Sequence, residues 1–126
     1  MFNILDRFPF SADSLDGIFC TGTLHYFPEK QLAKILKEIG RVIKPGGQII
    51  LDFATDIKRK LPNGKSVIKK GTPQYKVKEA KKMLKSLLEG FDVKFIELSV
   101  PEELVHKPGL TYKFSCKGWL LDAIKK

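Results

Sequence analysis

The stretch LDGIFCTGTLHYF, residues 15–27, decides the fold of this 126-residue chain when it is read with RVIKPGG at 41–47 and QIILDFA at 48–54. Residues 18–20 and 49–51 form two short apolar runs without alternation. Such runs are typical of parallel strands that are covered on both faces. The segment between them has helical periodicity, so this order predicts one βαβ crossover.

The segment between the two predicted strands reads as an amphipathic helix. Pro28 and Glu29 suit its first turn, because proline tolerates that position and a carboxylate there complements the helix dipole. The Pro-Gly-Gly sequence at 45–47 is predicted to end it. One apolar stripe should pack on the sheet, since its members recur at helical spacing: Leu32, Ile35, Leu36, Ile39, Val42 and Ile43.

Together these motifs resemble the second half of the class I (Rossmann-like) S-adenosylmethionine-dependent methyltransferases, in particular the type 11 group. FPF at 8–10 followed by SLD at 14–16 looks like the segment that leads into that family's fourth strand. EIGRVIKPGG at 38–47 looks like the segment that leads into the fifth. The resemblance covers about residues 3–54, and the remainder fits by layout. It implies an α/β fold: a truncated Rossmann-like sheet of strands equivalent to 4, 5, 7 and 6, the last antiparallel, with flanking helices.

Residues 1–126 are expected to form a single domain, which is a partial methyltransferase fold. A full domain of the resembled family is on the order of twice this length. Its cofactor pocket begins with a Gly-x-Gly loop, and this sequence contains none. The cofactor-binding first half is therefore expected to be missing. Three explanations remain open: a fragment of a full enzyme, a subunit completed by another chain, or a degenerate relative.

The resemblance implies S-adenosylmethionine as the cofactor and indicates which residues would face it. An Asp shortly before the FPF motif contacts the adenine in that family; the corresponding place here falls near Asn3, and Asp6 lies slightly later. In open α/β sheets ligands bind at the carboxyl ends of the strands. The loop after the first predicted strand would face the methionine part and the substrate: Thr21, Gly22, Thr23 and Leu24.

His25 and Tyr26 follow this loop and are the candidate catalytic residues. The functional interpretation requires His25 to reach the substrate as a general base. The alternative is that His25 packs or caps, as a lone histidine near a helix often does. The enzyme, if completed by its missing half or by a partner, would be a transferase.

Downstream, the sequence predicts a hairpin or flap at 57–68 around Asn63 and Gly64, and a helix over 75–89 that begins near Thr72 and Pro73. Strands are predicted at 91–100 and 110–124, with one loop between them that is marked by 101–103 and 107–109 and contains a turn at 104–105. Gly118 reads as a bulge or bend. Tyr112 and Trp119 read as packing residues.

Positive charge is concentrated in one part of the chain. The net charge is +9, and residues 56–90 hold eleven Lys and Arg against three acidic residues. A basic patch over 58–85 could attract an anionic substrate or RNA, which gives an alternative function as a non-catalytic interaction or RNA-associated module. The other interpretation is a solvated, lysine-rich surface.

Two further properties concern the environment and the partners of the chain. No apolar run is long enough for a membrane span, and Cys20 and Cys116 lack metal-ligand spacing, so a cytoplasmic protein with reduced thiols and no metal site is expected. Removing the family's first strands would expose the strand at 16–21 as an apolar edge. Such an edge seeks a partner, so a homodimer or a complementing subunit is expected there.

Overall fold

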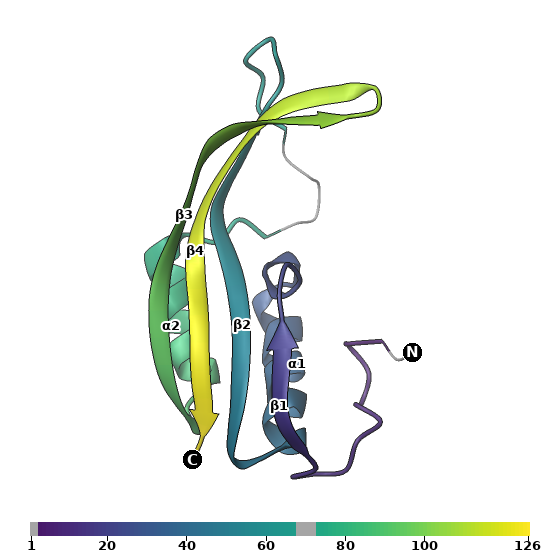
Figure 1. The fold of residues 1–126 in the computed structure, drawn as a ribbon, viewed down its shortest axis with the longest axis vertical. Helices are drawn as coiled ribbons and strands as arrows, with labels where there is room; N and C mark the ends of the chain where they lie inside the picture. Colours follow the sequence, from purple (N-terminus) through teal and green to yellow (C-terminus); the bar gives the residue numbers. More distant parts are fainter. Residues whose placement is uncertain (1–2, 68–72) are drawn as a thin grey trace.

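The computed structural model describes residues 3–67 and 73–126 and shows one sheet with helices packed against it (Figure 1). The sheet has four strands in the order β1-β2-β4-β3. In chain order the elements are β1 Leu15–Cys20, the 3-10 helix η1 Leu24–Tyr26, α1 Glu29–Val42, β2 Ile43–Lys60, α2 Val77–Leu87, β3 Phe91–Lys107 and β4 Leu110–Lys125.

The pairing of the strands confirms the predicted crossover and the predicted sheet. β1 and β2 are parallel neighbours, with Ile18 opposite Ile49 and Phe19 opposite Ile50. β4 lies between β2 and β3 and runs antiparallel to both. The last strand of the chain is therefore the antiparallel one, as the resemblance implied.

Helix α1 buries the stripe that the sequence predicts, since Leu32, Ile35 and Val42 are fully buried with the other members. However, the helix ends at Val42 and β2 begins at the next residue, so 45–47 does not form a turn between them. Instead these residues loop out inside β2, where the register jumps from Leu15 opposite Ile43 to Gly17 opposite Gln48. Gly46 permits this loop because its φ is +81°.

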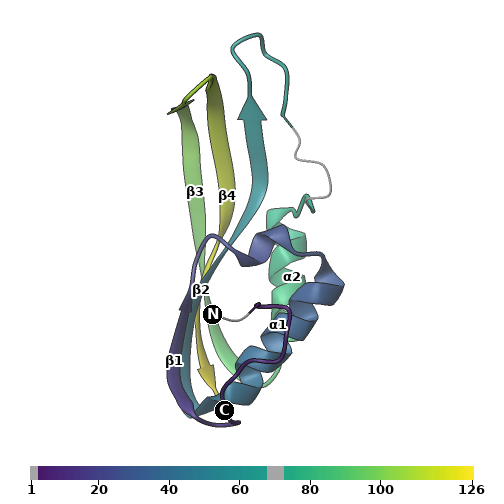
Figure 2. The same ribbon diagram turned by 90° about the vertical axis from the view of Figure 1, so that its right-hand side faces the viewer.

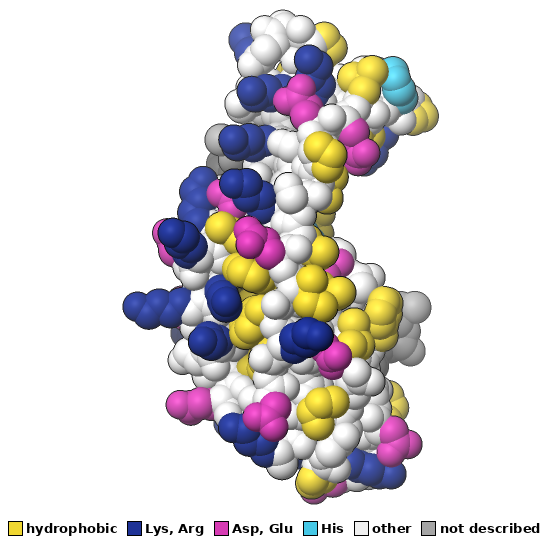
Figure 3. All heavy atoms as spheres, turned by 60° about the vertical axis from the view of Figure 1, so that its left-hand side comes forward, with side chains coloured by type: hydrophobic (Ala, Val, Ile, Leu, Met, Phe, Trp, Pro, Cys, Tyr) yellow, Lys and Arg dark blue, Asp and Glu magenta, His cyan; other side chains and the backbone are white. Residues whose placement is uncertain are grey.

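Only one face of the sheet carries helices among the described residues. Figure 2 shows α1 and α2 on the same side of the strands. On the other face Phe19 is 74% exposed, and three more apolar side chains there are exposed, namely Ile96, Leu98 and Ile124. Figure 3, with β3 turned forward, shows hydrophobic side chains along the middle of the molecule. The prediction that the first strand is covered on both faces is therefore wrong for this chain.

The strands are longer than the sequence predicts. β2 extends to Lys60, and β3 runs through the predicted loop at 101–103 to Lys107. Pro101 lies at an irregularity between Val100 and Glu103, and β3 is an edge strand. Proline is tolerated there because an edge strand does not need every backbone N–H for the ladder. The chain reverses at residues 108–109, where Gly109 has a φ of +73°.

The predicted flap is a hairpin in its described part. The N–H of Leu61 donates to the carbonyl of Lys65, and the N–H of Val67 donates to that of Arg59 at 2.7 Å. Asn63 and Gly64 lie at its turn. Ile68, which the prediction included, lies outside the described residues.

Helix α2 begins differently from the prediction. Thr72 lies outside the described residues, and the helix starts at Val77. The N–H of Val77 donates to a carboxylate oxygen of Asp56 at 3.1 Å. Asp56 has a φ of 48° at the irregularity of β2 between Thr55 and Lys58. A carboxylate from a neighbouring strand thus caps the helix.

Gly118 is not a bulge, because it pairs in register with Ala54 and Leu98. A Cβ at this position would lie 2.4 Å from the carbonyl oxygen of Phe53, so the close backbone requires glycine. The neighbouring Trp119 is a packing residue, as predicted. Its ring is buried against Phe95, and its indole N–H donates to the carbonyl of Val77 at 2.7 Å.

Candidate functional site

The loop after β1 is held in place by a carboxylate from β2. The backbone N–H of Gly22 donates to Asp52 Oδ1 at 2.8 Å. Asp52 directly follows Leu51, which pairs with Cys20 at the end of β1. The loop therefore follows the carboxyl end of β1, the place where open α/β sheets bind ligands, while β2 continues past it to Lys60.

Four of the six predicted cofactor-binding residues are contiguous: three form the loop after β1, and Leu24 is the first residue of η1. Gly22 has a φ of +65° and open space around the position of a Cβ, so a ligand can approach its backbone. Thr23 donates from its hydroxyl to the carbonyl of Thr21 at 2.9 Å, which stiffens the turn. Leu24 is fully buried and anchors η1. The loop can offer backbone groups and hydroxyls to a ligand, while Leu24 contributes packing.

His25 and Tyr26 lie on η1 but are differently exposed. His25 is 7% exposed, and its Nδ1 is buried without a hydrogen-bond partner among the described residues. Burial lowers the pKa of His25, Arg59 lowers it further, and the charge of Asp52 opposes the shift. The lowered pKa favours the neutral form of the imidazole. Tyr26 is nearer the surface and is 40% exposed. The centre of its ring lies 4.3 Å from the centre of the His25 imidazole.

Asn3 and Asp6 lie on the segment before β1. The side chain of Asn3 accepts a hydrogen bond from the N–H of Leu5 at 2.9 Å, and the N–H of Asp6 donates to the carbonyl of Asn3. Ile4 lines the same apolar hollow as Cys20. The structure thus places the segment alongside β1, and Asn3 uses its side chain to hold its own turn.

Glu38 and Arg41 bind the FPF segment to α1. Glu38 accepts a hydrogen bond from the N–H of Phe8 at 2.8 Å, and Arg41 donates to the carbonyls of Phe8 and Phe10. The two side chains also form an ion pair at 2.8 Å. These bonds hold the FPF motif at 8–10 to the EIGRVIKPGG motif at 38–47.

Cys20 and Cys116 are both free, and burial raises the pKa of each thiol. Residues 3–67 and 73–126 contain no group of three His, Cys, Asp or Glu side chains able to hold a metal ion. None of the helices in the described part of the chain is long and apolar enough to cross a membrane.

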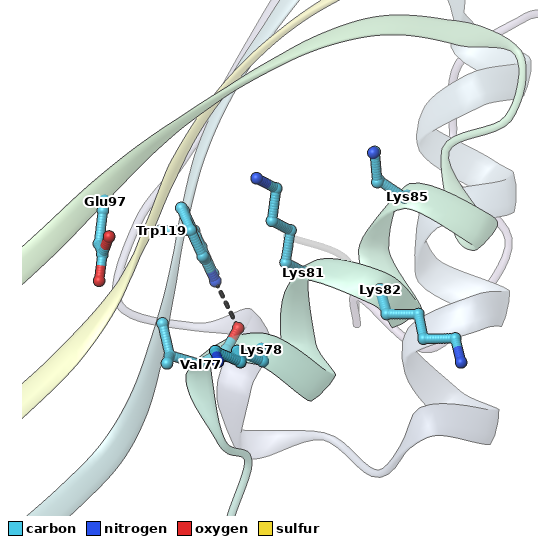
Figure 4. A pocket seen from close by; sticks show the side chains of 7 residues that line it. All are labelled: Val77, Lys78, Lys81, Lys82, Lys85, Glu97 and Trp119. Atoms are coloured by element: carbon cyan, nitrogen blue, oxygen red, sulfur yellow. Dashed lines mark hydrogen bonds between the residues drawn. The ribbon is translucent and has the colours of Figure 1, made fainter.

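A groove of about 460 Å³ lies between α2 and the sheet (Figure 4). Its floor is Trp119, and Lys81 reaches over that ring with its Nζ 5.0 Å from the ring centre. Glu97 and Val77 complete the wall, and three more lysines of α2 line the groove: Lys78, Lys82 and Lys85. This groove holds part of the predicted basic patch; Lys69 and Lys70 of that patch lie outside the described residues.

Comparisons with known proteins agree with this geometry. Residues 3–51 match the family model described as Methyltransferase domain. Among solved structures, the YcgJ protein from Bacillus subtilis is 16% identical, with a TM-score of 0.63; the match covers 99% of this chain and 69% of that one. A SAM-dependent methyltransferase from Methanosarcina mazei is 17% identical, with a TM-score of 0.57 and coverage of 98% and 65%.

A third solved structure is that of LepI in complex with SAM. It is 12% identical, with a TM-score of 0.52 and coverage of 98% of this chain and 29% of that one. No curated protein matches the sequence. The chain spans only part of each of these three solved structures.

The fold is that of the class I S-adenosylmethionine-dependent methyltransferases. Within that fold, β1, β2, β4 and β3 take the places of the fourth, fifth, seventh and sixth strands. The sequence did not indicate that Asp52 holds the Gly22 loop, because these residues are 30 positions apart. A polar residue ending the second apolar run was the only available signal.

Proposed function

We propose that this chain supplies the substrate-side half of an S-adenosylmethionine-dependent methyltransferase, active when the strands that precede β1 in the full sheet come from another segment or subunit. The observation that carries the proposal is the Gly22 loop, which follows the carboxyl end of β1 and is held by Asp52 of the parallel neighbour β2. A ligand at this point would lie beside His25 and Tyr26 at the start of η1.

The residues fit one wall of a cofactor site. Thr21, Gly22 and Thr23 would face the methionine part, while Asn3 and Asp6 would lie toward the adenine. The cofactor supplies a methyl group on a sulfonium, whose carbon–sulfur bond breaks as the acceptor's lone pair bonds to the methyl carbon. This in-line displacement depends mainly on positioning. The neutral His25 would take the acceptor's proton where there is one, with Tyr26 beside it.

Completion of the site would occur at β1. In the described chain β1 pairs with β2 alone, and Phe19 exposes most of its ring on the uncovered face. Edge strands with apolar surface attract further strands. Residues 1–55 contain as many acidic as basic residues, so a second copy can approach this end without strong repulsion despite the net charge of +9. We therefore favour a homodimer through β1, with a complementing subunit as the other outcome.

The cofactor proposal is tested by NMR titration of the 15N-labelled chain with S-adenosylhomocysteine. We expect millimolar binding that shifts the resonances of residues 21–24, because only one wall of the pocket is present. Gly22→Ala should abolish these shifts, whereas Gly109→Ala, which also replaces a glycine of positive φ, should keep them. If no loop resonance moves at millimolar ligand, this chain alone does not bind the cofactor.

The partner proposal is tested by light scattering at micromolar concentration. The wild type should be dimeric, Phe19→Glu monomeric, and Leu104→Glu dimeric, since Leu104 is also exposed but lies near the far end of β3. A monomeric wild type would contradict the homodimer and leave the complementing subunit.

A second candidate function rests on the basic groove of α2. Four lysines along one groove favour a polyanion such as RNA, whose backbone charge they would attract. Fluorescence anisotropy should then show affinity that falls with salt and is lost on charge reversal of the four groove lysines, Lys78, Lys81, Lys82 and Lys85. Binding that is independent of salt would exclude this function.

A further inference from the structure

A second hollow lies beside Tyr26, and none of the residues proposed above to face the cofactor lines it. Its volume is about 330 Å³, within the range of small-molecule sites. We call it the hairpin pocket, because β2 and the two hairpins beyond it supply all of its described lining except Tyr26. The lining residues are Tyr26, Arg59, Val67, Lys107, Leu110 and Tyr112.

The described lining is cationic, with two basic side chains and no carboxylate. The guanidinium of Arg59 lies 5.5 Å from the ring centre of Phe114, and Lys107 Nζ lies 5.9 Å from that of Tyr112. Neither cation forms an ion pair with any described carboxylate. The aromatic rings orient the two charges without neutralising them, so an anion between them would gain charge-assisted hydrogen bonds.

The rest of the lining is apolar or aromatic and accessible. Val67 is 39% exposed and Leu110 45%, although each borders a concave surface. Tyr112 is largely buried and forms a rigid wall. Apolar side chains around a hollow with two charges suit a ligand that has an apolar body and an anionic end.

We infer that the hairpin pocket binds the methyl acceptor, and that this acceptor is an amphipathic organic anion with a carboxylate or phosphate held between Arg59 and Lys107. The link to methyl transfer rests on the proposed function, because Tyr26 lies four residues beyond Gly22 in the same loop and helix. The binding of the anion itself does not depend on it.

The test is isothermal calorimetry of the whole chain, without cofactor, using 2-naphthyl phosphate, 2-naphthoate, 2-naphthol and inorganic phosphate as probes. We expect the two charged naphthyl probes to bind at least about tenfold more tightly than the other two, since a charged hydrogen bond contributes roughly that factor. The tighter of the two shows whether the site prefers phosphate or carboxylate. Equal binding of 2-naphthol or of inorganic phosphate would overturn the inference.

Variants locate the site. Arg59→Gln and Lys107→Gln should each weaken binding of the preferred probe about tenfold, and Lys82→Gln, which removes a charge from α2, should not. Circular dichroism confirms that the variants fold. Equal weakening by all three variants would show a non-specific charge effect and contradict the pocket. The cofactor titration is independent, so either proposal can fail while the other stands.

Discussion

Glu38 and Arg41, one helical turn apart on α1, both form hydrogen bonds to the backbone of the FPF segment at 8–10. Glu38 accepts from the N–H of Phe8, while Arg41 donates to the carbonyl of the same residue at 3.0 Å. The ion pair thus satisfies both backbone groups of one residue in a segment that has no strand of its own. The sequence motif that carries the family resemblance is therefore a structural clamp in this chain.

Acid should weaken this clamp. Hydrogen bonds from Arg41 and Phe8 lower the pKa of Glu38 to about 2, from a usual value of 4.5. Because the pKa is lower in the folded state, the clamp's stabilisation is complete above pH 4.5 and is lost as the pH falls toward 2. Urea unfolding between pH 7 and pH 2.5 should therefore show a smaller decrease in stability for Glu38→Gln than for the wild type. Glu89→Gln, at an exposed site, should follow the wild type.

The charge of Asp52 should be measurable at two neighbours. It raises the pKa of both His25 and Cys20, in each case as a smaller cause than burial. Asp52→Asn should lower both pKa values, so His25 stays neutral to lower pH and Cys20 is alkylated faster at pH 8. NMR titration and iodoacetamide kinetics in a Cys116→Ser background measure these changes. Asp16→Asn is the control, and identical kinetics in both variants would contradict the assignment.

Gly118 should not accept a side chain. Gly118→Ala would force a Cβ against the Phe53 carbonyl, and we expect a loss of about 1–3 kcal/mol in the free energy of unfolding. Gly90→Ala has open space around its Cβ and should change stability little. Thermal unfolding of the two variants distinguishes the positions. If Gly118→Ala were as stable as Gly90→Ala, β4 could move away from β2 at this position at little cost in free energy.

Two phenylalanines on neighbouring strands should differ in their effect on stability. Phe53 is fully buried, so Phe53→Ala should cost about 3–5 kcal/mol. Phe19 is mostly exposed, and Phe19→Ala should cost far less when measured by urea unfolding at a concentration where the chain is monomeric. A large loss for Phe19→Ala under that condition would show that its face is covered within one chain.

The local part of the fold was predictable because short-range signals agree. The apolar stripe from Leu32 to Val42 has helical spacing, and apolar runs of strand length stand on either side of it. The strand boundaries were not predictable from Pro45 or Pro101. Each proline suggests an interruption, yet β2 loops out around the first and β3, as an edge strand, tolerates the second.

The site was predictable only where its residues are contiguous. The loop at 21–24 and the neighbouring His25 and Tyr26 lie together because they follow one strand. Asp52, Arg59 and Lys107 are brought near them by the pairing of long strands. No periodicity or spacing indicates such pairs, since strand register is a property of the whole sheet.

The position of β4 has a consequence for how this chain is made. β2 and β3 both leave the ribosome before the strand that separates them, and neither pairs with the other. During synthesis one edge of β2 and the whole of β3 have no strand partner, and their backbone groups bind water until residues 110–125 emerge and insert between them. The nascent sheet is therefore vulnerable to premature association, and chaperone contact should be longest at this stage.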